Sequence, residues 1–257
     1  MTAFVSNLTP SEHRLVEEVG YEPAAIVSGS SVLHVLPPVP HPYSSAEMYR
    51  MSDLLVGARR SMLRRLRQSA ERSRAAGVVG LRLQVDDFDE HRRLVHLVAV
   101  GTAVTRKGPP PDRAPAFFSC NLDGQDFHLL VRAGWLPASV VLGCSVCRVG
   151  RQRPVRWSLD RPRSGEMTEA TTVLYAAREM AMERLQRAAR DDGADGVVGV
   201  TITERSHVWG SHILELLVVG TSIIRVDPHA APIHPDYVFG LSGGDQPTVD
   251  GRHGTAK

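Results

Sequence analysis

Two cysteines separated by two residues are the first candidates for chemistry in this chain. Cys144 and Cys147 have the C-x2-C spacing at which two thiolates can hold zinc or a softer metal ion. The surrounding segment predicts a β-strand, in which residues i and i+3 point to opposite faces about 10 Å apart. A shared metal ion therefore requires a bulge or turn beginning at Gly143. Without one, both cysteines are small buried core residues.

An arginine-rich segment is the second candidate site. Between Arg148 and Arg163 the chain carries six arginines around Trp157, among them Arg151, Arg153 and Arg156. Guanidinium groups bind phosphates, and an indole ring can stack on a nucleic-acid base. The pattern indicates an RNA- or phosphate-binding surface, and the alternative is a charged loop on an oligomeric protein.

Other polar residues offer weaker patterns. Glu215 and His96 stand in apolar strand segments, where a polar group lies either near a buried surface or at the solvent end of the strand. The acidic run from Asp86 to His91 could hold a hard cation or form a solvated hairpin tip. We find no Ser-His-Asp spacing motif, no H-E-x-x-H and no Walker sequence. We therefore predict a protein that is not an enzyme.

Composition sets the class of protein. Of the 257 residues, 42% are hydrophobic and 23% are charged, which is typical of globular domains. The net charge of +2 is too small to indicate nucleic acid or an anionic membrane as the partner of the whole surface. The first ten residues lack the charged and apolar regions of a signal peptide, and no apolar run is long enough for a membrane span. With three cysteines, too few for a disulfide framework, we expect a cytoplasmic protein that does not enter a membrane.

One stretch occurs twice and organises the rest of the chain. Ala76–Gly80 and Asp195–Gly199 lie 119 residues apart, and both precede a Gly-Thr pair at the same interval. The segments further upstream align at an offset of 114, so that Ser30 and Leu33 stand where the second copy has its two cysteines. The duplication predicts one module over residues 1–107 and another over 118–226, joined by a linker at 108–117 and followed by a disordered tail at 227–257.

Each copy predicts the same series of elements. Thr9-Pro10-Ser11-Glu12 has the form of an N-cap for a short helix that ends at Gly20. A strand with a glycine bend follows over 24–36, then a long helix over 46–75, which recurs over 166–192 in the second copy. Gly77 or Gly193 would close this helix, and Gly80 or Gly199 would permit close packing.

The last strand of each copy is apolar on both faces, over residues 94–100 and 213–219. One helix cannot cover both faces of a strand. The second face must therefore lie against the other copy, the short helix or another subunit.

The pattern resembles the YbjQ-like family of heavy-metal-binding domains. The residues that carry the match lie mostly in the second copy: Ala177, Arg178, Leu185, Ala189, Gly193, Ala194, Asp195, Gly196, Val197, Val198, Gly199, Gly220 and Thr221. The resemblance implies small two-layer β-α-β-β modules that assemble into rings, typically pentamers. If the rings are five-fold, five two-module chains would form two stacked rings, one of each copy.

The sequence thus predicts an α+β fold of two β-α-β-β modules, each preceded by a short helix, with mainly antiparallel sheets. The function that we predict is that of a non-enzymatic homo-oligomer, a ring, with a heavy metal ion as its candidate ligand. RNA or phosphate binding through Arg148–Arg163 is the alternative.

Overall fold

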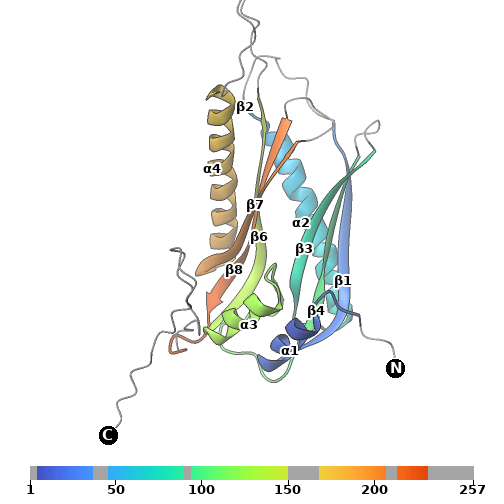
Figure 1. Ribbon diagram of the computed structural model, residues 1–257, viewed down its shortest axis with the longest axis vertical. Helices are drawn as coiled ribbons and strands as arrows, with labels where there is room; N and C mark the ends of the chain where they lie inside the picture. The colour runs from blue at the N-terminus through green and yellow to red at the C-terminus, as the bar shows by residue number, and fades with distance from the viewer. Residues whose placement is uncertain (1–4, 37–45, 90–93, 150–167, 207–212, 231–257) are drawn as a thin grey trace, which may run out of the picture.

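The chain folds into two similar halves, each with a short helix, a long helix and long antiparallel strands (Figure 1). The computed structural model describes residues 5–36, 46–89, 94–149, 168–206 and 213–230. The first half contains α1 (Pro10–Glu18), β1 (Tyr21–His34), β2 (Ala46–Glu47), α2 (Tyr49–Arg72), β3 (Gly77–Asp89) and β4 (Leu94–Arg106). The second contains β5 (Phe118–Ser119), α3 (Gly124–Arg132), β6 (Trp135–Arg148), α4 (Thr168–Asp191), β7 (Gly196–Ser206) and β8 (Ile213–Arg225). The predicted α+β class and its duplicated units are confirmed.

The first short helix begins as the sequence predicts. Thr9 caps α1 and accepts a hydrogen bond from the backbone of Glu12, whose carboxylate accepts one from the backbone of Thr9 in return. In the second half, Asp123 caps α3 by accepting from two backbone N–H groups of the first turn. Gly20 follows α1 with a φ of 85°, a conformation that favours glycine.

Each sheet takes one short strand from the other half of the chain. The first sheet has the order β1-β4-β3-β5, and β5, from the second half, pairs in parallel with β3. The second sheet has the order β2-β6-β8-β7, and β2, from the first half, pairs antiparallel with the end of β6. This exchange, which was not predicted from the sequence, interlocks the two modules.

The two sheets and the two long helices form four layers. Figure 1 shows α4 against the second sheet, with α2 between that sheet and the first one. One core cluster accordingly joins residues of α2 to both sheets, while a separate cluster lies between α4 and the second sheet. Strand β8 is therefore covered on both faces, and its second cover is the other copy, one of the three alternatives expected from its apolar pattern.

Two glycine assignments need correction. Gly29 does not bend β1, which continues through it in register with β4. Its role is packing: a Cβ there would overlap the backbone of α2 at Met62 and Leu66, and Gly143 has the same relation to α4. Gly77 does not close α2 either, because it already belongs to β3, and Arg74 takes the left-handed conformation with a φ of 54°.

The remaining predicted segments fall partly outside the described residues. The linker at 108–117 is described, and its Arg113 donates a hydrogen bond to the carbonyl oxygen of Arg225. The tail predicted at 227–257 lies outside the described residues from position 231 onward. Within the described part of the chain, no helix combines the length and apolar character that crossing a membrane requires.

Candidate functional site between the two modules

The duplicated glycines form a backbone bulge that an asparagine holds in place. Gly80 has a φ of 65° and Gly199 a φ of 60°, and the strand register shifts at both positions. The side-chain amide of Asn7 donates to the carbonyl oxygen of Gly80 at 3.0 Å, and that of Asn121 donates to Gly199 at 2.8 Å. The repeated Gly-x20-Gly-Thr spacing is explained by this contact, since the threonine of each pair bonds to the same asparagine.

The threonine contacts complete the clasp in both copies. In the first module the backbone N–H of Asn7 donates to Thr102 Oγ1 at 3.1 Å, and in the second that of Asn121 donates to Thr221 Oγ1 at 3.0 Å. Both threonine side chains are buried. The segment before each short helix is therefore held on its own sheet in the same way.

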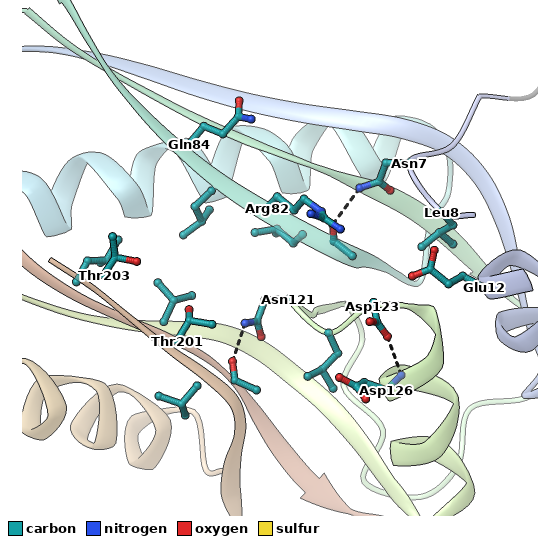
Figure 2. Close-up of a pocket in the computed structure, with 18 residues that line it drawn as sticks. Asn7, Leu8, Glu12, Arg82, Gln84, Asn121, Asp123, Asp126, Thr201 and Thr203 are labelled. Carbon is teal, nitrogen blue, oxygen red and sulfur yellow. Dashed lines mark hydrogen bonds between the residues drawn. The ribbon is translucent and has the colours of Figure 1, made fainter. Parts of the chain in front are cut away.

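A cleft of about 660 Å³ lies where the two bulges face each other (Figure 2). Strand β3 forms one wall and β7 the other, and the segment leading into α3 closes one end. The volume is within the range of small-molecule sites. The polar side chains that line it come from both modules: Asn7, Glu12, Arg82, Gln84, Asn121, Asp123, Asp126, Thr201 and Thr203.

The acidic groups at the end of the cleft are engaged in the fold. Burial opposes the ionisation of Glu12, but hydrogen bonds from Thr9 and from the backbone of Gly124 outweigh it and lower the pKa of the carboxyl. Because Gly124 begins α3, Glu12 links the short helices of the two modules. The cleft thus offers a polar surface without a nucleophile paired to a base among its lining residues.

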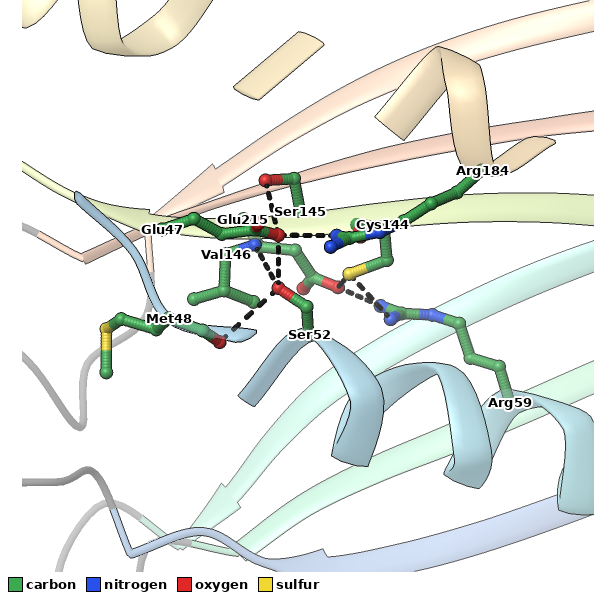
Figure 3. A network of polar contacts seen from close by, with 9 residues as sticks. All are labelled: Glu47, Met48, Ser52, Arg59, Cys144, Ser145, Val146, Arg184 and Glu215. Atoms are coloured by element: carbon green, nitrogen blue, oxygen red, sulfur yellow. Dashed lines mark hydrogen bonds and ion pairs between the residues drawn. The ribbon is translucent and has the colours of Figure 1, made fainter. Parts of the chain in front are cut away.

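A buried ion pair joins the modules between α2 and β8 (Figure 3). Arg59 of α2 and Glu215 of β8 approach to 2.5 Å, with side chains that are 1% and 2% exposed. Cys144 of β6 completes the group, because its thiol donates to the Glu215 carboxylate at 3.2 Å and accepts from the Arg59 guanidinium at 3.6 Å. The charged groups of Arg59 and Glu215 therefore bond to each other and to Cys144 and do not line a cavity.

Glu47 is the centre of a second set of contacts between the modules (Figure 3). Its carboxylate accepts hydrogen bonds from Ser52 at 2.9 Å, from Ser145 at 3.1 Å and from the guanidinium of Arg184. The backbone N–H of Val146 donates to the Ser52 hydroxyl at 2.9 Å. These bonds link β2, α2, β6 and α4 at one place, which fixes the register of β2 on β6. The bonds to Glu47 all reach Oε1, and its Oε2 is buried without a hydrogen-bond partner among the described residues.

Cys144 and Cys147 lie on opposite faces of β6. Cys144 packs in the cluster on the α2 side, whereas Cys147 packs with the residues of α4. Both are free thiols in the structure, as is Cys120. The strand therefore provides no shared position for a metal ion, and the guanidinium and the carboxylate beside Cys144 are paired with each other.

Burial makes the thiols poor nucleophiles. It raises the pKa of Cys120 to about 12 and that of Cys147 to about 11. The pKa of Cys144 is raised well above its ordinary value by burial and by the negative charge of Glu215. Among the residues that the structure describes, no group of three or more His, Cys, Asp or Glu side chains is arranged to hold a metal ion.

The arginine-rich candidates lie outside the described residues. Arg151, Arg153, Arg156 and Trp157 fall in the range 150–167, so RNA or phosphate binding through them stays a prediction. Glu215 is buried, as one of the two interpretations of its apolar strand required. Its counterpart His96 is only half-buried on the first sheet.

The partner of Glu215 was not predicted from the sequence. Arg59 belongs to an arginine-rich helix and looks like a residue of a solvated face. Arg59 lies one residue beyond Ala58 of the apolar stripe of α2. This position indicates burial only once a second sheet packs against that side of the helix.

The fold and this interface define the class of protein: a tandem α+β protein whose two modules share strands and a buried polar interface. A family model described as "Putative heavy-metal-binding" matches residues 11–107 and 138–225. The chain belongs to this family, the YbjQ-like family.

Two relatives extend the comparison. The chain is 34% identical over 240 residues to the encapsulin nanocompartment protein Rv1762c of Mycobacterium tuberculosis, a match that covers 92% of this chain and 91% of the relative. It is also 36% identical over 63 residues to the UPF0145 protein VP1283 of Vibrio parahaemolyticus, covering 24% of this chain and 58% of that protein. The first relative therefore shares both modules.

Proposed function

We propose that this chain is a non-enzymatic protein that forms a homo-oligomer and acts together with an encapsulin nanocompartment. The observation that carries the proposal is the match to an encapsulin nanocompartment protein over nine-tenths of both chains. Because that match spans both modules, the association belongs to the two-module form rather than to an isolated module.

The interface between the modules supports a role in assembly. Its charged residues, Arg59, Glu215, Glu47 and Arg184, bond across the interface, and so they stabilise one arrangement of the two modules. By the repeat, each module also carries a counterpart of the surface that its partner module uses, and a homo-oligomer of such modules would use these counterparts. We expect the protein to act in the cytoplasm, and the three free thiols support a reducing compartment.

Co-purification tests the encapsulin association. The full chain would be expressed with an encapsulin shell protein from the same organism, and the assembled particles would be separated by size and examined by mass spectrometry. We expect the chain to elute with the particles. Its complete recovery in the low-mass fractions, while the particles form normally, would overturn this part of the proposal.

Native mass spectrometry combined with elemental analysis of the untagged protein tests the rest. We expect a mass that is at least twice that of the 28.1 kDa chain. A heavy metal ion is the ligand that the family description suggests. A stoichiometric metal would establish that ligand, and a metal-free oligomer would remove it while leaving the assembly role in place.

A further inference from the structure

Each module contributes one surface to the contact between the two modules. Because the modules are repeats, each of these surfaces has a counterpart on the other module. The first module contributes the side of α2 that faces away from its own sheet, together with the edge of β3. The second module contributes the face of its sheet that covers α2, together with the segment Phe118–Leu122. The counterparts of these surfaces can be located through the offsets of 119 and 114 residues.

The counterpart of the outer side of α2 is exposed on α4. Val56 and Leu63 of α2 are partly buried against the core that includes the second sheet. At the equivalent positions α4 carries Tyr175 and Met182, and Tyr175 is 60% exposed. An aromatic side chain of this size on an open helix face is a typical anchor for a partner.

The counterpart of the covered sheet face is open on the first sheet. Val140 and Val146 of β6 face α2 and are buried. Ile26 and Val32 occupy the equivalent positions of β1, and they are 44% and 58% exposed. Between them, Ser28 and Ser30 stand where β6 has Leu142 and Cys144. The first sheet therefore has a helix on one face, while its other face carries two exposed apolar side chains at positions whose counterparts in the second module contact a helix.

The edges of β3 and β7 show the same relation, in which a covered surface of one module has an exposed counterpart on the other. At β3, the backbone N–H groups of Gly80 and Leu81 donate to the carbonyl oxygens of Leu122 and Cys120, both at 3.0 Å. The equivalent strand β7 is the terminal strand of its sheet as the structure describes it, and its Val200 is 41% exposed.

The segment Val5–Leu8 is the counterpart of Ser119–Leu122. The equivalent asparagine clasp holds it on its own module in the same position. Its Val5 is 55% exposed. It is therefore placed to add to the edge of a β7 strand from another molecule, as the later segment adds to β3.

We propose that the outer side of α4 and the edge of β7 bind a second copy of this chain, through the open face of its first sheet and its segment Val5–Leu8. This proposal rests on the proposed homo-oligomer and specifies its interface. The contact is head-to-tail, so an open assembly keeps one unused surface at each of its two ends until it closes. The modules alternate along such an assembly, in place of the two separate stacked rings expected from the resemblance.

A mixing experiment with two variants tests this geometry. In Ile26→Glu/Val32→Glu the open face of the first sheet carries charges, and in Tyr175→Glu the outer side of α4 carries one. Each variant should shift from the oligomeric mass to the 28.1 kDa monomer, because its assembly cannot propagate. An equimolar mixture should form a 1:1 dimer, since one intact surface of each kind remains. Circular dichroism spectra and melting temperatures would verify that both variants fold.

The outcomes separate this inference from the proposed function. A wild-type monomer would refute the homo-oligomer itself. A wild-type oligomer that neither variant dissociates, a single variant that still dimerises with itself, or a mixture that stays monomeric would refute the head-to-tail interface alone. Val200→Pro provides a second, independent variant, because it removes the backbone donor on the β7 edge and should also reduce assembly.

Arg187→Glu is the matched control. Arg187 lies on α4 and is exposed, and its counterpart Gln68 is exposed on α2 despite the contact between the modules. A charge reversal at this position should leave the oligomeric mass unchanged.

Discussion

Removal of either partner of the Arg59–Glu215 pair should destabilise the protein far more than removal of both. The two groups are 2.5 Å apart and nearly fully buried, so their attraction amounts to about 6–7 kcal/mol at an effective dielectric constant of about 20. Much of this offsets the cost of removing both charges from water. Each single substitution, Arg59→Met or Glu215→Leu, leaves one uncompensated charge and should cost about 3–5 kcal/mol.

The double variant Arg59→Met/Glu215→Leu replaces the ion pair by apolar contacts between α2 and β8. It should lie within about 1–2 kcal/mol of the wild type, because neither charge of the pair remains to be buried. The assay is urea denaturation followed by circular dichroism, with the coupling energy taken from the complete double-mutant cycle. Arg187→Met on the exposed Glu183–Arg187 pair is the control and should change stability by about 0.5 kcal/mol or less.

Single variants that lose less than about 1 kcal/mol of unfolding free energy would show that the pair behaves as a solvent-exposed one, which would refute this prediction. It would equally be refuted by a double variant that loses the sum of the two single costs, since additive losses mean that the groups do not interact.

Three further predictions concern the packing, the thiols and the acid stability. Gly143→Ala should destabilise the fold by at least about 1–3 kcal/mol, because its Cβ would overlap the α4 backbone at Ala181. The control Gly57→Ala, in open space on α2, should be neutral or stabilising, and thermal denaturation compares the two variants. The three cysteines should react with a thiol reagent only after unfolding, since burial raises the pKa of each; rapid reaction in the native protein would contradict this. Glu12 has a lowered pKa in the folded state, so its contribution to stability is present above the unfolded value near 4.5 and is lost as the pH falls through the folded value. Glu12→Gln should therefore flatten the acid side of the stability curve, and an unchanged pH dependence in urea denaturation would exclude this role.

Local patterns were sufficient to predict most of the fold. The capping box at Thr9, the two long helices and the paired glycine stretches each depend on residues close together in the chain. The predicted helices at 46–75 and 166–192 correspond to α2 (Tyr49–Arg72) and α4 (Thr168–Asp191). Periodicity detects such elements because one helix or strand contains the whole signal.

The interface could not be predicted in the same way. Strands β2 and β5 have two residues each, too few for any periodic pattern, and each pairs with a strand of the other module. Glu215 was recognisable as a polar residue in an apolar strand, but Arg59 was not, because its burial depends on the docking of a second sheet onto α2. Long-range packing decides both cases.

The buried pair also explains how the chain can distinguish its internal interface from the proposed external one. By the repeat, the counterparts of Arg59 and Glu215 are Arg178 and His96, which cannot form the same ion pair, and Arg178 bonds to Glu204 of its own module instead. An ion pair that is only available between the two modules of one chain favours their mutual contact over contact with another molecule. Exchanging His96 for Glu would supply the missing carboxylate to the open face of the first sheet. If the head-to-tail interface exists, His96→Glu should strengthen the assembly, as measured by native mass spectrometry. If the wild-type protein is a monomer, the same substitution should leave it monomeric.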